Sequence, residues 1–197
     1  MENMEKGKFV IILARTGSGK TTLEESLKEL FNLSGVTAWS MKTATTRKIR
    51  EGESENAYLF LSNDEFDKMK KNGDFLSSFD APNGSWVKYG VPTYINKKDG
   101  VGLFSAISQS YAMDTYNSLK EKGEDAVLVV LDVSLKERMK RLSSRGEDPD
   151  SIKKRVEIEK IEGDYNLEEL PSSSIIIKDD IMPPEKIAEN VFKELKK

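Results

Sequence analysis

Cysteine and histidine are both absent from the 197 residues of this chain. Without cysteine, disulfides, thiolate chemistry and cysteine-ligated zinc are excluded. Without histidine, imidazole acid–base catalysis and the usual hydrolytic triads are excluded as well. Any chemistry must therefore rest on carboxylates, hydroxyls, lysine, arginine, main-chain amides and ions taken from solution.

Long hydrophobic runs are scarce too. The longest, Phe9–Ala14 and Ala126–Leu131, are far shorter than the ~18 residues of a membrane span. The polar N-terminus has no apolar segment behind a basic start, so we expect no secretory signal, no membrane partner and a cytoplasmic protein.

Neither sign of charge dominates the chain. Lysine and arginine number 31, and aspartate and glutamate number 34, which gives a net charge of −3. This balance excludes a generally basic nucleic-acid binder, and we expect no nucleic-acid partner. At ~100–200 residues per domain, a chain of this length predicts one compact unit with small insertions.

Short apolar runs alternate with helical patterns along most of the chain. We expect strands at residues 8–13, 36–42, 101–107, 126–132 and 174–177, and helices at 21–32, 109–122, 134–144, 149–161 and 184–196. Continuous apolar strands that alternate with helices predict an α/β fold, in which a parallel sheet carries helices on both faces.

Residues 43–95 interrupt this rhythm. Their first part, 43–56, is polar and basic and is typical of a loop. Ser62 and Glu65 form a capping-box pattern that begins a helix, which Gly73 ends. Short strands are expected at 58–61, 75–79 and 85–89, the last two joined by the turn residues Pro82-Asn83-Gly84. The segment therefore predicts an inserted, partly antiparallel small sheet.

The strongest motif is Ala14-Arg15-Thr16-Gly17-Ser18-Gly19-Lys20-Thr21-Thr22, between an expected strand and an expected helix. Glycines let the main chain curl so that successive N–H groups point into one concavity, and the helix N-terminus adds a positive dipole end. Such a phosphate-binding loop (P-loop) tolerates Ala14 in place of its usual first glycine. The loop indicates a nucleoside triphosphate but names no reaction.

Within this loop we expect two side chains to carry specific roles. Lys20 would reach the β- and γ-phosphates of ATP, and the Thr21 hydroxyl would bind Mg²⁺. A dinucleotide-binding loop is excluded, because Lys20 directly follows Gly19 and no acidic ribose-binding residue is evident ~20 residues later. We expect ATP to contact Thr16, Gly17, Ser18, Gly19, Lys20, Thr21 and Thr22.

A second basic cluster lies in Thr43-Ala44-Thr45-Thr46-Arg47-Lys48-Ile49-Arg50-Glu51-Gly52-Glu53. Arg47 and Arg50 are three residues apart among hydroxyl side chains. Planar guanidinium groups bind phosphate through two parallel hydrogen bonds, which favours an anion site. Taken alone, the pair is equally compatible with a solvated basic loop.

The order of motifs resembles that of guanylate kinases. Beside the P-loop and the Thr-Thr-Arg-x-x-Arg-x-Gly-Glu stretch, Tyr58-Leu-Phe, Asp64-Glu65-Phe66 and Lys88-Tyr89-Gly90 occur in the family's sequence order. The resemblance runs from about Lys8 to the C-terminus. It implies a P-loop core at 1–41, 96–135 and 164–197, a nucleoside-monophosphate-binding insertion at 42–95 and a helical lid at 136–163.

The resemblance also implies an activity, which is transfer of the γ-phosphoryl group of ATP to GMP or dGMP with Mg²⁺. The acceptor would contact Thr43, Arg47, Arg50, Tyr58, Ser77 and Tyr89. Lys20, Arg47, Arg145 and Arg155 would be catalytic, because the lid arginines neutralise charge on the phosphates in transit, and Arg141 would contact ATP.

The chain departs from the family at its base-reading positions. Ser77 stands where the family has a glutamate that accepts two hydrogen bonds from guanine, and Val91 stands where the family has a serine. One hydroxyl cannot replace two carboxylate oxygens. The Asp-x-Asp of the family is absent, since residues 104–108 read Phe-Ser-Ala-Ile-Ser.

Other functions therefore stay open beside phosphorylation of GMP or dGMP. The acceptor could be a different nucleoside monophosphate, a modified purine or a phosphate compound without a base. The chain could also be a catalytically weak binding module, although the intact Lys20-Thr21 argues against this. The sequence is compatible with a monomer or a homodimer.

Overall fold

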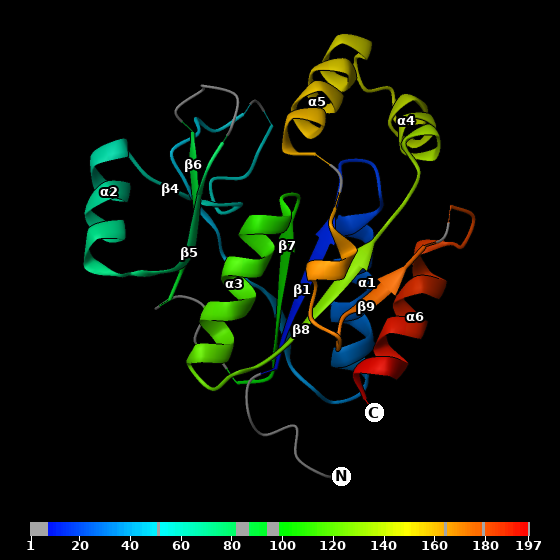
Figure 1. Ribbon diagram of the computed structural model, residues 1–197, viewed down its shortest axis with the longest axis horizontal. Helices are drawn as coiled ribbons and strands as arrows, with labels where there is room; N and C mark the ends of the chain where they lie inside the picture. The colour runs from blue at the N-terminus through cyan, green and yellow to red at the C-terminus, as the bar shows by residue number, and fades with distance from the viewer. Residues whose placement is uncertain are drawn as a thin grey trace.

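The computed structural model describes residues 8–50, 52–81, 87–93, 99–163, 165–178 and 180–196. A five-stranded parallel sheet lies at its centre, in the order β2-β7-β1-β8-β9 (Figure 1). Its strands are β1 (Lys8–Ala14), β2 (Ala38–Ser40), β7 (Val101–Ala106), β8 (Asp125–Leu131) and β9 (Ile175–Ile177). The predicted α/β fold class is confirmed.

Helices cover both faces of this sheet, and the strand β1 shows why. Ile11 belongs to the hydrophobic cluster under α3 (Gln109–Glu121), whereas its neighbour Val10 belongs to the cluster under α1 (Lys20–Leu33) and α6 (Pro184–Leu195). Successive side chains of a strand point to opposite faces, so a strand that is apolar at every position fits only between two layers of helices.

A second, four-stranded mixed sheet lies beside the first, in the order β4-β3-β6-β5 (Figure 1). Its strands are β3 (Ala44–Thr45), β4 (Leu59–Phe60), β5 (Phe75–Asp80) and β6 (Lys88–Pro92). The strand β3 was not expected, because it lies inside the polar stretch 43–56. Its two residues are fully buried, and pairing with β4 and β6 overrides the local composition. The expected turn at 82–84 falls outside the described residues.

Capping sets the ends of the helix α2 (Asn63–Asn72), which flanks the small sheet. The Ser62 hydroxyl accepts from the Glu65 amide, and the Glu65 carboxylate accepts from the Ser62 amide, so the predicted capping box is formed. Gly73 follows in the left-handed region and ends the helix.

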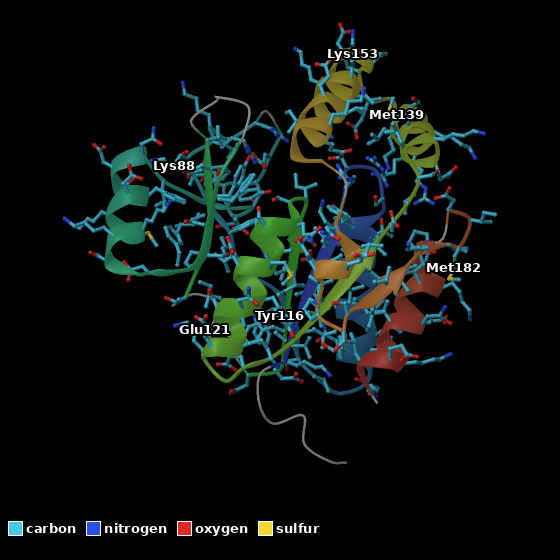
Figure 2. All side chains as sticks on the ribbon, in the orientation of Figure 1. Lys88, Tyr116, Glu121, Met139, Lys153 and Met182 are labelled. Carbon is cyan, nitrogen blue, oxygen red and sulfur yellow. The ribbon has the colours of Figure 1, made fainter. Side chains whose placement is uncertain are left out.

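Two further helices, α4 (Leu135–Ser144) and α5 (Pro149–Glu162), stand above the same edge of the parallel sheet as the small sheet does (Figure 1). They occupy the segment expected as a lid. Charged side chains such as Lys153 on α5 and Glu121 on α3 project from the outer faces of their helices (Figure 2). A single-turn helix (Leu167–Glu169), which the sequence did not predict, connects α5 to β9. None of the described helices is both long and apolar enough to cross a membrane.

Candidate active site

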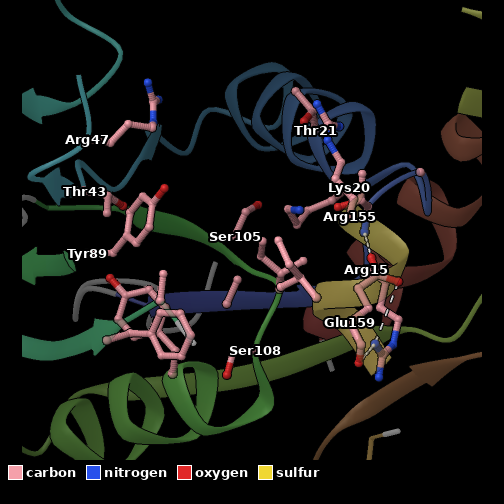
Figure 3. A pocket seen from close by; sticks show the side chains of 18 of the residues that line it. Arg15, Lys20, Thr21, Thr43, Arg47, Tyr89, Ser105, Ser108, Arg155 and Glu159 are labelled. Atoms are coloured by element: carbon pink, nitrogen blue, oxygen red, sulfur yellow. Dashed lines mark hydrogen bonds and ion pairs between the residues drawn. The ribbon is translucent and has the colours of Figure 1, made fainter. Parts of the chain in front are cut away.

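A cavity of about 530 Å³ lies where the P-loop, the small sheet and the helix pair meet. Most of the site residues expected from the sequence line it, and Figure 3 shows Arg47, Thr43 and Tyr89 on one side and Lys20, Thr21 and Arg155 on the other. The expected residues on its wall are Thr16, Gly17, Gly19, Lys20, Thr21, Thr22, Thr43, Arg47, Arg50, Tyr58, Tyr89, Arg145 and Arg155. The structure therefore brings both basic clusters to one cavity.

The P-loop follows β1 directly, and its backbone has no room for a side chain at Gly17. Gly17 has φ of 82°, and a Cβ there would lie 2.9 Å from the carbonyl oxygen of Arg138. Gly19 caps α1 without any side-chain hydrogen bond to the first amides of the helix. These amides are thus left for an anion at the helix N-terminus. Ser18 differs from the expectation, since its side chain is buried and does not line the cavity.

Lys20 carries a charge that the protein itself only partly compensates. Burial lowers the pKa of its ammonium group, while the carboxylates of Glu24 and Glu159 raise it and Arg155 lowers it further. A lysine with a lowered pKa at the wall of a cavity is a group that gains from binding an anion. This matches the phosphate-binding role expected for Lys20.

Two buried charged residues, which the sequence analysis missed, hold the P-loop in place. Glu159 of α5 accepts from the Thr16 amide at 3.0 Å and forms an ion pair with Arg138 of α4 at 2.7 Å. Arg138 also donates to the carbonyl oxygens of Thr16 and Val133. The available signal was helical spacing: Arg138 and Glu159 occupy buried positions that an apolar residue would normally fill.

Arg15 adds a third connection between the loop and the helix pair. It donates to the carbonyl oxygens of Glu159 and Gly163, and its guanidinium lies 4.6 Å from the ring centre of Tyr165. The Tyr165 hydroxyl in turn donates to the carbonyl oxygen of Ile107, at 2.8 Å. The P-loop is thereby fastened to both the end of α5 and the segment after β7.

The second basic cluster centres on Arg47, whose guanidinium forms two hydrogen bonds of 2.7 Å with the Glu53 carboxylate. Glu53 also accepts from the Arg50 amide at 3.0 Å, and these contacts lower its pKa to about 2. The guanidinium lies 5.0 Å from the ring centre of Tyr58, which packs edge-on against Tyr89. Glu53 and Tyr58 therefore fix the direction in which Arg47 can approach an anion.

Between the two clusters the cavity wall is aromatic and hydroxyl-bearing. The ring of Tyr111 stacks on Phe79, with centres 5.7 Å apart, and meets Phe104 edge-on. Burial raises the pKa of the Tyr111 phenol, an effect that the nearby Ser77 hydroxyl partly offsets. Ser105 and Ser108 also line this part of the cavity.

Ser77 does not line the cavity. It is buried on β5, where its hydroxyl lies 2.6 Å from that of Thr115, and it is paired in register with Val91 on β6. Among the described residues, three carboxylates line the cavity, and each is paired with an arginine. These pairs are Glu53 with Arg47, Glu147 with Arg155, and Glu159 with Arg138.

The expected lid arginines occupy different environments. Arg145 is exposed and lines the cavity, and Arg155 lines it while paired with Glu147 at 3.0 Å. Arg141 lies outside the cavity wall, where it donates to the carbonyl oxygens of Ser18 and Asp180. Its position between the P-loop and the segment before α6 is compatible with a contact to ATP, but the cavity itself does not include it.

The residues on the wall suit a magnesium ion that arrives with phosphates. No three acidic residues come together as a metal cage within the described part of the chain. The exposed Thr21 side chain lines the cavity, and a hydroxyl is an oxygen ligand of the kind Mg²⁺ takes. Mg²⁺ is commonly held by one or two protein oxygens together with substrate phosphates, so the donor set fits it.

Comparison with known proteins places this geometry in a family. A model described as an AAA domain matches residues 10–162, which include the P-loop, the small sheet and the helix pair. The chain belongs to this AAA domain family. No curated protein sequence matches it.

Solved structures show the same fold at low sequence identity. The guanylate kinase of Anaplasma phagocytophilum has a TM-score of 0.60 and 20% identity, with 98% of this chain and 86% of that chain covered. The APS kinase CysC of Mycobacterium tuberculosis, solved with AMPPNP and APS, has a TM-score of 0.57 and 17% identity, with 98% and 99% covered. The chain shares its fold with these two kinases, and the resemblance to guanylate kinases holds at the level of the fold.

Proposed function

We propose that the protein is a nucleoside monophosphate kinase that transfers the γ-phosphoryl group of ATP to the phosphate of its acceptor, with GMP and dGMP as the first acceptors to test. The observation that carries this proposal is the shared cavity. One wall holds Lys20 beside the open N-terminus of α1, and the opposite wall holds Arg47 with Tyr58 and Tyr89. Two anion sites that face one cavity suit a donor and an acceptor phosphate.

The arrangement can perform phosphoryl transfer without a protein base. An oxygen of the acceptor phosphate attacks the γ-phosphorus, the bond from that phosphorus to the β–γ bridging oxygen breaks, and ADP leaves. Lys20 and the loop amides hold the donor, Arg47 orients the acceptor, and Arg145 and Arg155 neutralise charge between them. Mg²⁺, when bound beside Thr21, supplies further charge neutralisation at the phosphates.

The groups on the cavity wall bear on which base the acceptor carries. Guanine presents neighbouring N–H donors that a free carboxylate would bind, yet the carboxylates on the cavity wall are engaged with arginines. The wall instead offers the aromatic rings of Phe79, Phe104 and Tyr111. This composition favours, as a second candidate, a nucleoside monophosphate whose base is held by stacking and neutral hydrogen bonds.

The deciding experiment is ADP release with Mg·ATP across GMP, dGMP, AMP, CMP, UMP and dTMP, with adenylyl sulfate as a further acceptor. We expect turnover with at least one of the monophosphates, and the preferred base separates the two candidates. Arg47→Ala should raise the acceptor KM by about tenfold or more, since a charge-assisted phosphate contact is lost. Lys48→Ala is the matched control, because Lys48 is the exposed neighbour that does not line this cavity.

Two outcomes would contradict the proposal. Turnover with adenylyl sulfate and with none of the monophosphates would indicate a kinase for a different phosphate compound, as is the case for the APS kinase that shares the fold. No turnover at all, together with weak binding of Mg·ATP, would indicate a binding module.

A further inference from the structure

The carboxylate of Glu24 does not line the cavity itself, but it is hydrogen-bonded to Ser105, which does. β7 ends beside the P-loop, and the sequence of residues 104–108 contains no acid. Ser105 lies within this stretch, lines the cavity, and is in register with Ile12 of β1. Its hydroxyl donates a hydrogen bond to the carboxylate of Glu24, which belongs to α1. The acid that β7 lacks is therefore supplied at the same place by a helix.

The position of Glu24 on α1 explains how it gets there. It follows Lys20 by four residues and Thr21 by three, and residues at these spacings share one face of a helix. Glu24 is half-buried, and the Ser105 hydroxyl holds it against the end of β7.

Such a carboxylate has a chemical use at a triphosphate site. Mg²⁺ bound to ATP keeps several water molecules. A carboxylate on the same helix as Thr21 can accept hydrogen bonds from these waters or bind the ion itself. We propose that Glu24 is the carboxylate that positions the magnesium ion of Mg·ATP in this protein, with Thr21 as its hydroxyl partner and Ser105 as the group that orients it. The inference rests on the proposed function only for binding of the triphosphate, and not on the acceptor.

The test measures how strongly Mg²⁺ improves nucleotide binding. Calorimetric titration gives the Kd of AMPPNP in magnesium and in EDTA, and the ratio of the two is the coupling between metal and nucleotide. Glu24→Gln keeps the shape and an acceptor for the Ser105 hydroxyl but removes the charge. We expect the coupling to fall about tenfold or more, which is the usual cost of losing a group that orients a metal, while binding in EDTA is unchanged or tighter. Glu25→Gln, at the exposed neighbouring position, should leave the coupling intact.

A second variant separates this role from a structural one. In Glu24→Gln/Ser105→Asp the acid is moved from α1 to β7, at the other end of the same hydrogen bond. We expect this double variant to recover most of the lost coupling, which a residue that only stabilised α1 would not do. If Glu24→Gln folds too poorly for titration, Ser105→Ala replaces it, and a partial loss of coupling is expected.

The result that would overturn the proposal is an unchanged magnesium coupling in Glu24→Gln or in its substitute Ser105→Ala. The proposal would also be contradicted if Glu24→Gln lost the coupling and the double variant did not recover it. The acid would then act on the helix and not on the ion. Either result leaves the acceptor assay untouched, so this proposal and the kinase proposal fail separately.

Discussion

At the scale of single residues, each cationic side chain of the site is set by its immediate neighbours. Arg47 is oriented by Glu53 and Tyr58, whereas Lys20 faces the cavity with a lowered pKa. Arg47 is thus oriented by Glu53 whether or not a ligand is bound. Lys20 gains a closely placed counter-charge only when an anion enters the cavity.

Lys20 should therefore lower the stability of the ligand-free fold while it supports turnover. Its pKa is lowered on balance, which means that folding disfavours the charge even with Glu24 and Glu159 nearby. We expect Lys20→Met to raise the melting temperature of the ligand-free protein and to reduce turnover about a hundredfold or more. The stabilisation that Mg·ATP gives to the wild type should disappear, and a melting temperature that falls in the ligand-free variant would contradict this assignment. Calorimetry with and without nucleotide checks both effects.

The ion pair of Arg47 and Glu53 should show a defined pH dependence. The pKa of Glu53 is about 2 in the folded protein against an ordinary 4.5, so the pair stabilises the fold above pH 4.5 and loses its effect as the pH falls towards 2. Thermal melts of the wild type and Glu53→Gln should therefore differ by a constant amount above pH 5.5 or so and converge in acid. The acceptor KM of Glu53→Gln should rise about threefold to tenfold, because Arg47 is no longer oriented.

At the scale of elements, the connection between α5 and the P-loop is the feature with the largest consequence. The buried carboxylate of Glu159 joins the Thr16 amide of the loop to Arg138 of α4, so three elements meet at one group. These contacts attach α4 and α5 to the P-loop side of the cavity. Any movement of α5 must first break these contacts.

Removing the Glu159 charge should loosen the helix pair α4 and α5 more than the parallel sheet. Glu159→Gln leaves Arg138 as a buried unpaired cation, which typically costs about 3–5 kcal/mol. Because Glu159 joins α4 and α5 to the P-loop, we expect faster amide hydrogen exchange in 135–163 with little change in β1 and β8. Glu157→Gln, an exposed change on the same helix, is the control. Equal exchange in both variants would show that the Glu159 carboxylate does not hold α4 and α5 against the P-loop.

At the scale of the whole molecule, the two basic clusters lie on opposite sides of one cavity. Lys20 lies at the start of α1 beside the parallel sheet, and Arg47 lies beside the small sheet (Figure 3). A ligand that carries phosphates for both can therefore contact both walls at once.

This geometry predicts tight binding of a two-headed ligand. Adenosine and guanosine joined by five phosphates should bind at least about a hundredfold more tightly than ATP or GMP alone, because the second contact is made at high effective concentration. The corresponding adenosine–uridine compound tests the base. Thermal shift and calorimetry measure the gain, and Arg47→Ala should abolish most of it. Affinity no better than that of ATP would mean that the two clusters do not serve one reaction.

The sequence by itself determined the α/β fold and the helix limits. Apolar alternation, capping residues and glycine positions act locally, so the capping box of α2 and the P-loop between β1 and α1 could be predicted from short windows. The loop also indicated the donor nucleotide, because its chemistry lies in consecutive residues.

The tertiary structure alone decided what surrounds these local features. The pairing of the short strand β3, the ion pair of Arg138 with Glu159 and the hydrogen bond from Ser105 to Glu24 each join separate elements. Helical spacing can indicate that Arg138 and Glu159 are buried, but no short window of sequence shows which residues pair. Ser77 shows the same limit, since its partner Thr115 lies 38 positions away on α3. Charge and hydroxyl groups acquire their roles from burial and from distant partners, and both are properties of the folded chain.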